Sequence, residues 1–134
     1  MRAAITSPHA AAPVGPYSHA VATESLLFLS AQAGLDPATG KLAPGGTGPE
    51  TRQVLENLHH VLAADGLDFS DVVKTNIYLL DMADWTAVNE IYGQLIGDPP
   101  PARTTIGPAS LPIGARIEIE MIAARHQIRG SARG

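Results

Sequence analysis

The sequence predicts an α+β domain in which two helices cover one face of a sheet of about six strands. Apolar residues recur at helical spacing in segments 47–66 and 81–97, and they alternate with polar residues in strand-length segments elsewhere. The chain has 134 residues, 45% of them hydrophobic, which is enough for one core. Because we find neither repeat nor linker, we expect one domain over residues 1–126 and a polar tail over 127–134.

Three short strands are expected in the N-terminal part of the chain, at residues 3–6, 19–23 and 26–30. A proline-rich loop separates the first two, because proline and glycine interrupt regular structure. The third strand, Leu-Leu-Phe-Leu-Ser, is almost wholly apolar and is therefore expected inside the sheet. Residues 36–48, rich in glycine and proline, are expected to form a loop.

The first helix is expected to begin near Thr47 and to end at Gly66. Thr47 and Glu50 match the S/T-x-x-E capping box. The apolar face of this helix then consists of Val54, Leu55, Leu58, Val61 and Leu62. A second helix is expected after Asp81, which can cap it, with Gly97 and the prolines that follow as its end. Its apolar stripe consists of Trp85, Val88, Ile91, Tyr92 and Leu95.

The remaining strands are expected at residues 72–80, 102–106 and 115–123. In the first of them, one face is expected to carry Val73, Thr75, Ile77 and Leu79, and the other Lys74, Asn76 and Tyr78. In the last of them, one face is expected to carry Ile117, Ile119, Met121 and Ala123, and the other Arg116, Glu118, Glu120 and Ile122. If the helices cover the apolar face, the second face is too apolar for plain solvent and too charged for a core. Such a face suits a subunit interface, so we predict a homo-oligomer.

Composition excludes several classes of function. The net charge is −4 and no segment concentrates lysine or arginine, which disfavours a nucleic-acid surface. The chain has no cysteine, and its histidines lack the spacing of a metal site. No phosphate-binding glycine motif and no nucleophile elbow is found, so we expect neither metal nor cofactor. No apolar run is long enough for a membrane helix, and we expect a cytoplasmic protein.

Six segments in order resemble the reactive intermediate deaminase (RidA, YjgF-like) family. They are PVGPYSHA, LFLSAQAGLDPATGKL, TRQVLENLHHVLAADG, VVKTNIYLLDMADWTAVNEIY, PPPART and LPIGARIEIEMIA. The resemblance implies a chorismate-mutase-like fold with a mixed six-stranded sheet backed by two helices. It also implies a homotrimer with active sites between subunits. The implied activity is hydrolysis of 2-iminobutanoate and 2-iminopropanoate, products of pyridoxal-phosphate enzymes, to 2-oxo acids and ammonia.

The resemblance also implies a set of site residues. Arg103 matches the substrate-binding arginine of the family and Glu118 its active-site glutamate. The other matching positions are Tyr17, Ser30, Ala31 and Asn89. Two departures bear on substrate preference and turnover: Ala31 stands where glycine is usual, and Thr104-Thr105 replaces a common serine-containing continuation.

The chemistry of these side chains agrees with the implied reaction. A planar guanidinium can hold a carboxylate through two parallel hydrogen bonds, and a partly buried carboxylate can activate water. Without the resemblance, Arg103 and Glu118 would be interpreted as a structural ion pair. Tyr17 could cap the core instead of lining a cleft, and Asn89 could be a solvated helix position. Glu120 could pair with Arg116 across an interface, and it is left out of the catalytic set.

Two alternative functions stay open. One is a non-catalytic module that binds a small carboxylic acid in the same cleft and needs Arg103 but no base. The other is an RNA-directed role as a ribonuclease or translation inhibitor, because some members of the family have been described in that way. The charge of −4 disfavours the RNA-directed role.

Overall fold

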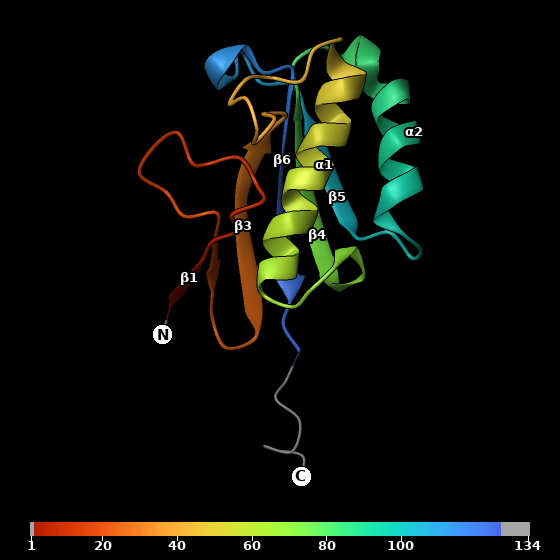
Figure 1. The fold of residues 1–134 in the computed structure, drawn as a ribbon. Coiled ribbons are helices and arrows are strands. Elements are labelled where there is room, and N and C mark those ends of the chain that lie inside the picture. Colours follow the sequence, from red (N-terminus) through yellow and green to blue (C-terminus); the bar gives the residue numbers. More distant parts are fainter. Residues whose placement is uncertain (1, 127–134) are drawn as a thin grey trace.

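A computed structural model describes residues 2–126 of the chain as one six-stranded sheet covered on one face by two helices (Figure 1). The helices are α1 (Thr47–Ala64) and α2 (Trp85–Ile96). The strands are β1 (Ala3–Ile5), β2 (Ala20–Ala22), β3 (Leu26–Ala33), β4 (Val72–Leu79), β5 (Ala102–Ile106) and β6 (Ile117–Ala124). Their order is β1-β2-β3-β6-β4-β5, with β4 and β5 parallel and all other pairs antiparallel. The predicted α+β architecture is confirmed.

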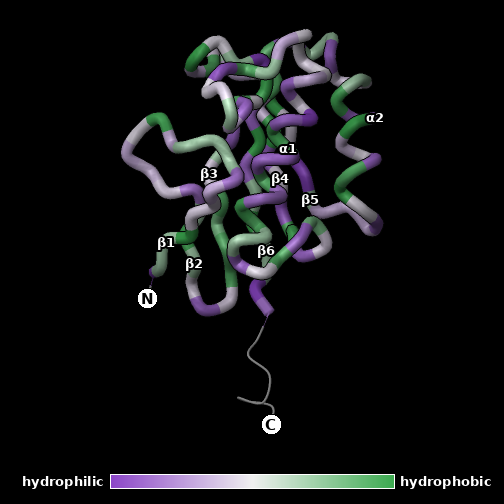
Figure 2. The backbone as a smooth tube through the Cα atoms, in the orientation of Figure 1, coloured by the Kyte–Doolittle hydropathy of each residue, from purple (hydrophilic) through white to green (hydrophobic). Residues whose placement is uncertain are grey.

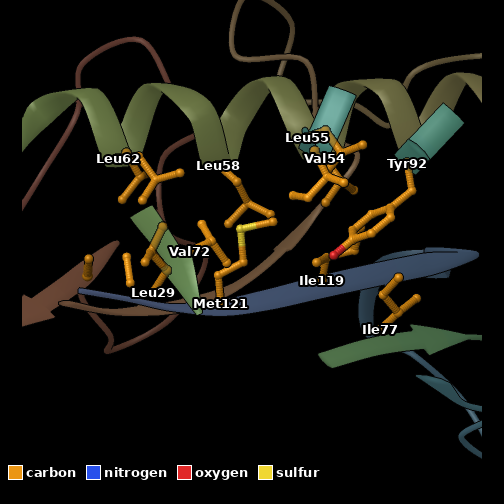
Figure 3. Packing of buried hydrophobic residues seen from close by; sticks show 14 of the residues in the cluster. Leu29, Val54, Leu55, Leu58, Leu62, Val72, Ile77, Tyr92, Ile119 and Met121 are labelled. Atoms are coloured by element: carbon orange, nitrogen blue, oxygen red, sulfur yellow. The ribbon is translucent and has the colours of Figure 1, made fainter. Parts of the chain in front are cut away.

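The core lies between α1 and the sheet. Side chains of α1, among them Leu58 and Leu62, point toward the sheet, where Met121 of β6 and Ile77 of β4 are fully or almost fully buried (Figure 3). Each such apolar side chain contributes about 1.5–3 kcal/mol by leaving water. Figure 2 shows hydrophobic and hydrophilic residues alternating within α1 and α2, as expected for helices buried on one side. No helix within residues 2–126 is both long and apolar enough to cross a bilayer.

The second face of the sheet is left uncovered by the helices. It carries the polar side chains expected there, because burial alternates along β4 and β6 as the sequence predicts. Large apolar side chains are also exposed on the strands, among them Phe28 on β3 and Ile106 on β5, which are 43% and 51% exposed. The uncovered face therefore carries both polar and apolar side chains, which is the property that led to the prediction of a subunit interface.

Two local predictions were wrong. Val73 was assigned to the buried face of β4, but a bulge between Val72 and Lys74 buries Val72 and leaves Val73 exposed. The capping box of α1 does not form, because α1 already begins at Thr47 and no side chain caps its end. Thr47 instead donates a hydrogen bond to the Asp84 carboxylate at 2.6 Å. The Glu50 carboxylate accepts the backbone N–H of Arg116 instead.

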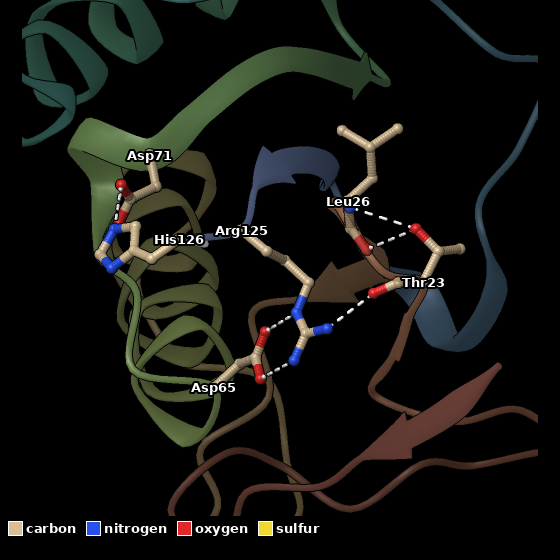
Figure 4. Close-up of polar contacts among 6 residues, drawn as sticks. All are labelled: Thr23, Leu26, Asp65, Asp71, Arg125 and His126. Carbon is tan, nitrogen blue, oxygen red and sulfur yellow. Dashed lines mark hydrogen bonds and ion pairs between the residues drawn. The ribbon is translucent and has the colours of Figure 1, made fainter. Parts of the chain in front are cut away.

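At the end of β6 near the C-terminus, Arg125 joins three parts of the fold (Figure 4). Its guanidinium donates two parallel hydrogen bonds to the carboxylate of Asp65, at 2.8 and 3.0 Å. A third bond, of 2.6 Å, reaches the carbonyl of Thr23. Asp65 follows α1 and Thr23 lies in the turn between β2 and β3, so this arginine ties the helix layer to two strands.

Candidate active site

Glu118 lies in a cavity of about 260 Å³ at the other end of β6. Four segments line this cavity: the loop before β2, the second half of β3 with Leu35 just after it, β6 itself, and the turn that precedes β6. Of the residues predicted for the site, the cavity is lined by Tyr17, Ser30, Ala31 and Glu118. The structure therefore brings together four of the six predicted residues, which come from three separate segments of the chain.

A β-bulge places Ser30 and Ala31 at the cavity. The pairing of β3 with β6 shifts register between Leu29 and Gln32, so the two residues between them leave the regular ladder. The Ser30 hydroxyl donates to the carbonyl of Ser18 at 2.8 Å, and its backbone N–H donates to the carbonyl of His19 at 3.0 Å. The loop before β2 and the bulge in β3 are thus fixed to each other. The bulge itself was not predicted from the sequence.

Tyr17 lines the cavity and does not cap the core. Its side chain is 44% exposed, and its hydroxyl oxygen accepts the backbone N–H of Val14 at 3.1 Å. The buried side chain of His19 fixes the loop that carries Tyr17 through two hydrogen bonds to its backbone. The His19 Nδ1 accepts the N–H of Ser7 at 3.1 Å, so its proton is on Nε2, which donates to the carbonyl of Ala11 at 2.7 Å.

Glu118 has the electrostatic environment of an acid–base group. Burial, and secondarily the charge of Glu120, raise the pKa of Glu118 above its usual range. No cation within residues 2–126 pairs with its carboxylate. Within one chain, Glu120 accepts the hydroxyl of Tyr78, and the carboxylate near Arg116 is that of Glu50. A pair between Glu120 and Arg116 across an interface stays a prediction.

Arg103 on β5 is held by α2 but is not neutralised by it. One Nη of the guanidinium donates to the Asn89 side-chain oxygen at 2.7 Å, and its central carbon lies 5.0 Å from the Trp85 ring and 5.1 Å from the Tyr92 ring. No carboxylate of the described chain pairs with it. Asn89, Tyr92 and Arg103 also line a second hollow, of about 520 Å³. Because the other guanidinium N–H groups form no side-chain bond within residues 2–126, they are available to an anion.

Arg103 and Glu118 lie on opposite faces of the sheet. Arg103 pairs with Thr75, whose side chain is buried under the helices and accepts the Tyr92 hydroxyl at 3.0 Å. Glu118 pairs with Tyr78, which projects from the uncovered face. A structural ion pair between Arg103 and Glu118 is thereby excluded within one chain.

Sequence reasoning missed the aromatic walls of the Arg103 site. Trp85 and Tyr92 were assigned only to the apolar stripe of the second helix, yet with Asn89 they form the side of α2 that faces Arg103. The signal was present, because a polar Asn89 lies on the helix at spacings of four and three residues from these aromatic residues.

A second missed feature is the buried hydroxyl oxygen of Thr105, which has no hydrogen-bond partner in the described part of the chain. Across residues 2–126, no group of three or more histidine, aspartate or glutamate side chains could hold a metal ion.

Comparison with known proteins identifies the family. The family described as Endoribonuclease L-PSP matches residues 7–125. A 2-iminobutanoate/2-iminopropanoate deaminase of Mus musculus is 46% identical over 125 residues, which are 93% of this chain and 93% of the relative. The crystal structure of RidA from an Antarctic Psychrobacter superposes with a TM-score of 0.88 at 37% identity, covering 91% of this chain and 98% of the other. The crystal structure of E. coli TdcF with bound serine superposes with a TM-score of 0.88 at 31% identity, covering 92% of this chain and 99% of the other. The chain therefore belongs to the reactive intermediate deaminase (RidA) family.

Proposed function

We propose that the protein hydrolyses short 2-imino acids, 2-iminobutanoate and 2-iminopropanoate, to 2-oxo acids and ammonia. The observation that carries this proposal is the pair formed by an unneutralised Arg103 and a Glu118 of raised pKa in a cavity. The curated deaminases among its relatives support the same reaction. Its substrates would be short-lived products of pyridoxal-phosphate enzymes.

The active site is proposed to form between subunits of a homotrimer. Arg103 and Glu118 are on opposite faces of one sheet, so a single chain cannot present both to one small molecule. A neighbouring subunit that brings its β5 edge to the uncovered face would place its Arg103 at the Glu118 cavity. The exposed apolar side chains of that face, such as Phe28 and Ile106, support burial against another subunit.

Arg103 is proposed to bind the substrate carboxylate. Its guanidinium is flanked by Trp85 and Tyr92 and oriented by Asn89, which leaves an edge with free N–H donors. Two charge-assisted hydrogen bonds to a carboxylate contribute about 1.5–3 kcal/mol each. Because the aromatic rings and Asn89 restrict the arginine before substrate arrives, little side-chain entropy is lost on binding.

Glu118 is proposed to move the protons of the reaction. As a carboxylate it takes a proton from water, whose oxygen attacks the imine carbon, and it passes that proton to the imine nitrogen, which gives a neutral tetrahedral amino alcohol. Glu118 then takes the proton of the new hydroxyl group and delivers it to the amino nitrogen, so that ammonia leaves as the carbonyl of the 2-oxo acid forms. A raised pKa makes both directions of transfer accessible near neutral pH, and such acid–base catalysis contributes roughly 10²–10⁴-fold. Tyr17 and Ser30 lie in the same cavity and are proposed to bind substrate, together with the backbone of Ala31.

A threonine dehydratase reaction run in the presence of semicarbazide tests the activity. The free imine is trapped as a semicarbazone unless it is hydrolysed first, so micromolar protein should reduce trapping. Undiminished trapping would contradict the proposed activity.

Mixed oligomers test the shared site. Arg103→Ala and Glu118→Gln should each be inactive, but co-expression of both should restore activity at about one quarter of the sites, because some interfaces then combine an intact Arg103 with an intact Glu118. A monomer at micromolar concentration, or no recovery in proven mixed oligomers, would contradict an intersubunit site.

The Glu118→Gln variant distinguishes the non-catalytic alternative from the proposed deaminase. A module that only binds a carboxylate keeps both its affinity and its behaviour in the semicarbazide assay when Glu118 becomes glutamine, whereas a catalyst loses turnover and keeps affinity. The family description names an endoribonuclease, but a net charge of −4 disfavours an RNA substrate. We accordingly propose no nucleic-acid partner and keep the cytoplasm as the expected location, which cell fractionation would test.

A further inference from the structure

Ile113, in the turn before β6, has a backbone conformation that does not suit its side chain. Its φ and ψ are 56° and 19°, and it is the only residue other than glycine with positive φ in the part of the chain that the structure describes. A branched Cβ is disfavoured in this left-handed region, where glycine and asparagine are common. The Ile113 side chain is also 48% exposed, so burial in the core does not explain an isoleucine at this position.

The surrounding structure holds this turn in place. The N–H of Ala115 donates to the carbonyl of Pro112 at 3.1 Å, and Ala115 itself is buried. The N–H of Arg116 donates to the carboxylate of Glu50 at 2.9 Å, and Glu50 on α1 is only 4% exposed. A helix carboxylate thus fixes the backbone directly after the turn, so the strained residue cannot simply relax.

The side chain of Ile113 lies where it can contact a substrate. Ile113 and Pro112 line the Glu118 cavity, together with Val14 and Leu35. Ile113, Val14 and Leu35 also line an adjoining hollow of about 300 Å³, whose other lining residues are Gly40, Lys41 and Leu42. One wall of the cavity is therefore aliphatic and leads into additional space, whereas Glu118 and Ser30 supply polar groups to the same cavity.

We propose that Ile113 is a specificity-determining residue that contacts the side chain of the 2-imino acid. The wall of Ile113, Val14 and Leu35 favours substrates with aliphatic side chains larger than methyl, including the imino acid derived from leucine. This inference rests on the proposed deaminase function and adds to it the class of side chain accepted. The strained backbone is maintained because it presents an apolar side chain to the substrate, which glycine or asparagine would not provide.

The test compares two imines in one assay. An L-amino-acid oxidase converts alanine or leucine to the corresponding 2-imino acid, semicarbazide traps what remains, and kcat/KM is obtained for each imine. Ile113→Asn should lower the ratio of kcat/KM for the leucine-derived over the alanine-derived imine about five- to tenfold, the lower end of what small apolar contacts provide in enzyme specificity. Its melting temperature should equal or exceed that of the wild type, because asparagine tolerates the left-handed conformation.

Two further variants serve as controls. Ile113→Val keeps the branched side chain and the strain and removes only one methylene, so its ratio should fall clearly less than that of Ile113→Asn. Leu95→Asn removes an exposed apolar side chain of α2 that does not line the Glu118 cavity, and its ratio should not change.

The outcomes separate this inference from the proposed function. An unchanged ratio in Ile113→Asn, with the alanine-derived imine still hydrolysed, would overturn the role of Ile113 and leave the deaminase intact. A lowered melting temperature with equal loss on both imines would overturn it in favour of a purely structural role. If the wild type hydrolyses neither imine, the deaminase proposal fails and the role of Ile113 fails with it.

Discussion

The fold contains one arginine that is paired with an acidic residue, Arg125 with Asp65, and one arginine and one acidic residue that are kept apart, Arg103 and Glu118. Near the C-terminus, Arg125 and Asp65 bind each other through two parallel hydrogen bonds, of 2.8 and 3.0 Å. Near the start of β6, Glu118 has no cationic partner within residues 2–126, and Arg103 is held by aromatic rings and one amide on the other face of the sheet. The pair of Arg125 and Asp65 ties separate parts of the fold together. Because Arg103 and Glu118 are kept apart, neither has a charged partner within residues 2–126.

The Arg125–Asp65 pair also illustrates the geometry proposed for substrate binding. A guanidinium with its donors satisfied by a carboxylate and a backbone carbonyl has little capacity left for a ligand. The Arg103 guanidinium is likewise held by several contacts, from Asn89 and two aromatic rings. However, no carboxylate of residues 2–126 forms an ion pair with it. This difference supports the binding function proposed for Arg103, whereas Arg125, which is both positioned and neutralised, fits a structural role.

The largest expected effect comes from Arg103→Ala. Loss of two charge-assisted bonds to the substrate carboxylate should lower kcat/KM about 10²–10⁴-fold. The free energy of unfolding should fall by no more than about 2 kcal/mol, because within the chain only the bond to Asn89 and the contacts with the Trp85 and Tyr92 rings are lost. Steady-state kinetics and urea denaturation of the same preparation measure both. Unchanged kcat/KM would contradict the role of Arg103.

Arg125→Met should lower stability and leave activity nearly unchanged, the converse of Arg103→Ala. Asp65 would be left largely buried without its partner, and the fold should lose about 2–3 kcal/mol, which is below the cost for a fully buried pair because the arginine is partly exposed. Urea denaturation measures this loss, and kcat/KM per folded molecule should stay within about twofold of wild type. If activity fell with stability unchanged, the comparison between the two arginines would be wrong.

The sequence predicted the architecture because periodicity records which side of each element is buried. Both helices and all six strands lie where alternation and helical spacing place them, within a few residues. The bulges at Val72–Lys74 and at Ser30–Ala31 were not predictable, since a bulge depends on pairing with a distant strand. The site residues came from family motifs, which carry no information on faces. That Arg103 and Glu118 face opposite ways follows only from the register of β4 with its two neighbours.

Asn89→Asp should make the environment of Arg103 resemble that of Arg125. A carboxylate 2.7 Å from the guanidinium would compete with the substrate carboxylate, so KM should rise about tenfold with a smaller change in kcat. The melting temperature should not fall, because the variant gains an ion pair. Asn89→Ser, which shortens the side chain without adding charge, is the matched control and should raise KM less. Equal KM values in Asn89→Asp and wild type would show that Arg103 does not bind the substrate anion.

The smallest expected effect is the pH dependence of stability at Glu118. Because the folded state raises the pKa of Glu118, the folded protein favours its protonated form, and this unpaired carboxylate lowers the free energy of unfolding as pH rises through the raised pKa. Glu118→Gln removes that dependence, so the melting temperature of the variant minus that of the wild type should increase from pH 4 to pH 7. The paired carboxylate of Asp65 provides the contrast, since Asp65→Asn should destabilise the fold at pH 7. A Glu118→Gln difference that is constant with pH would mean that Glu118 has no raised pKa, and the acid–base role proposed for it would lose its electrostatic basis.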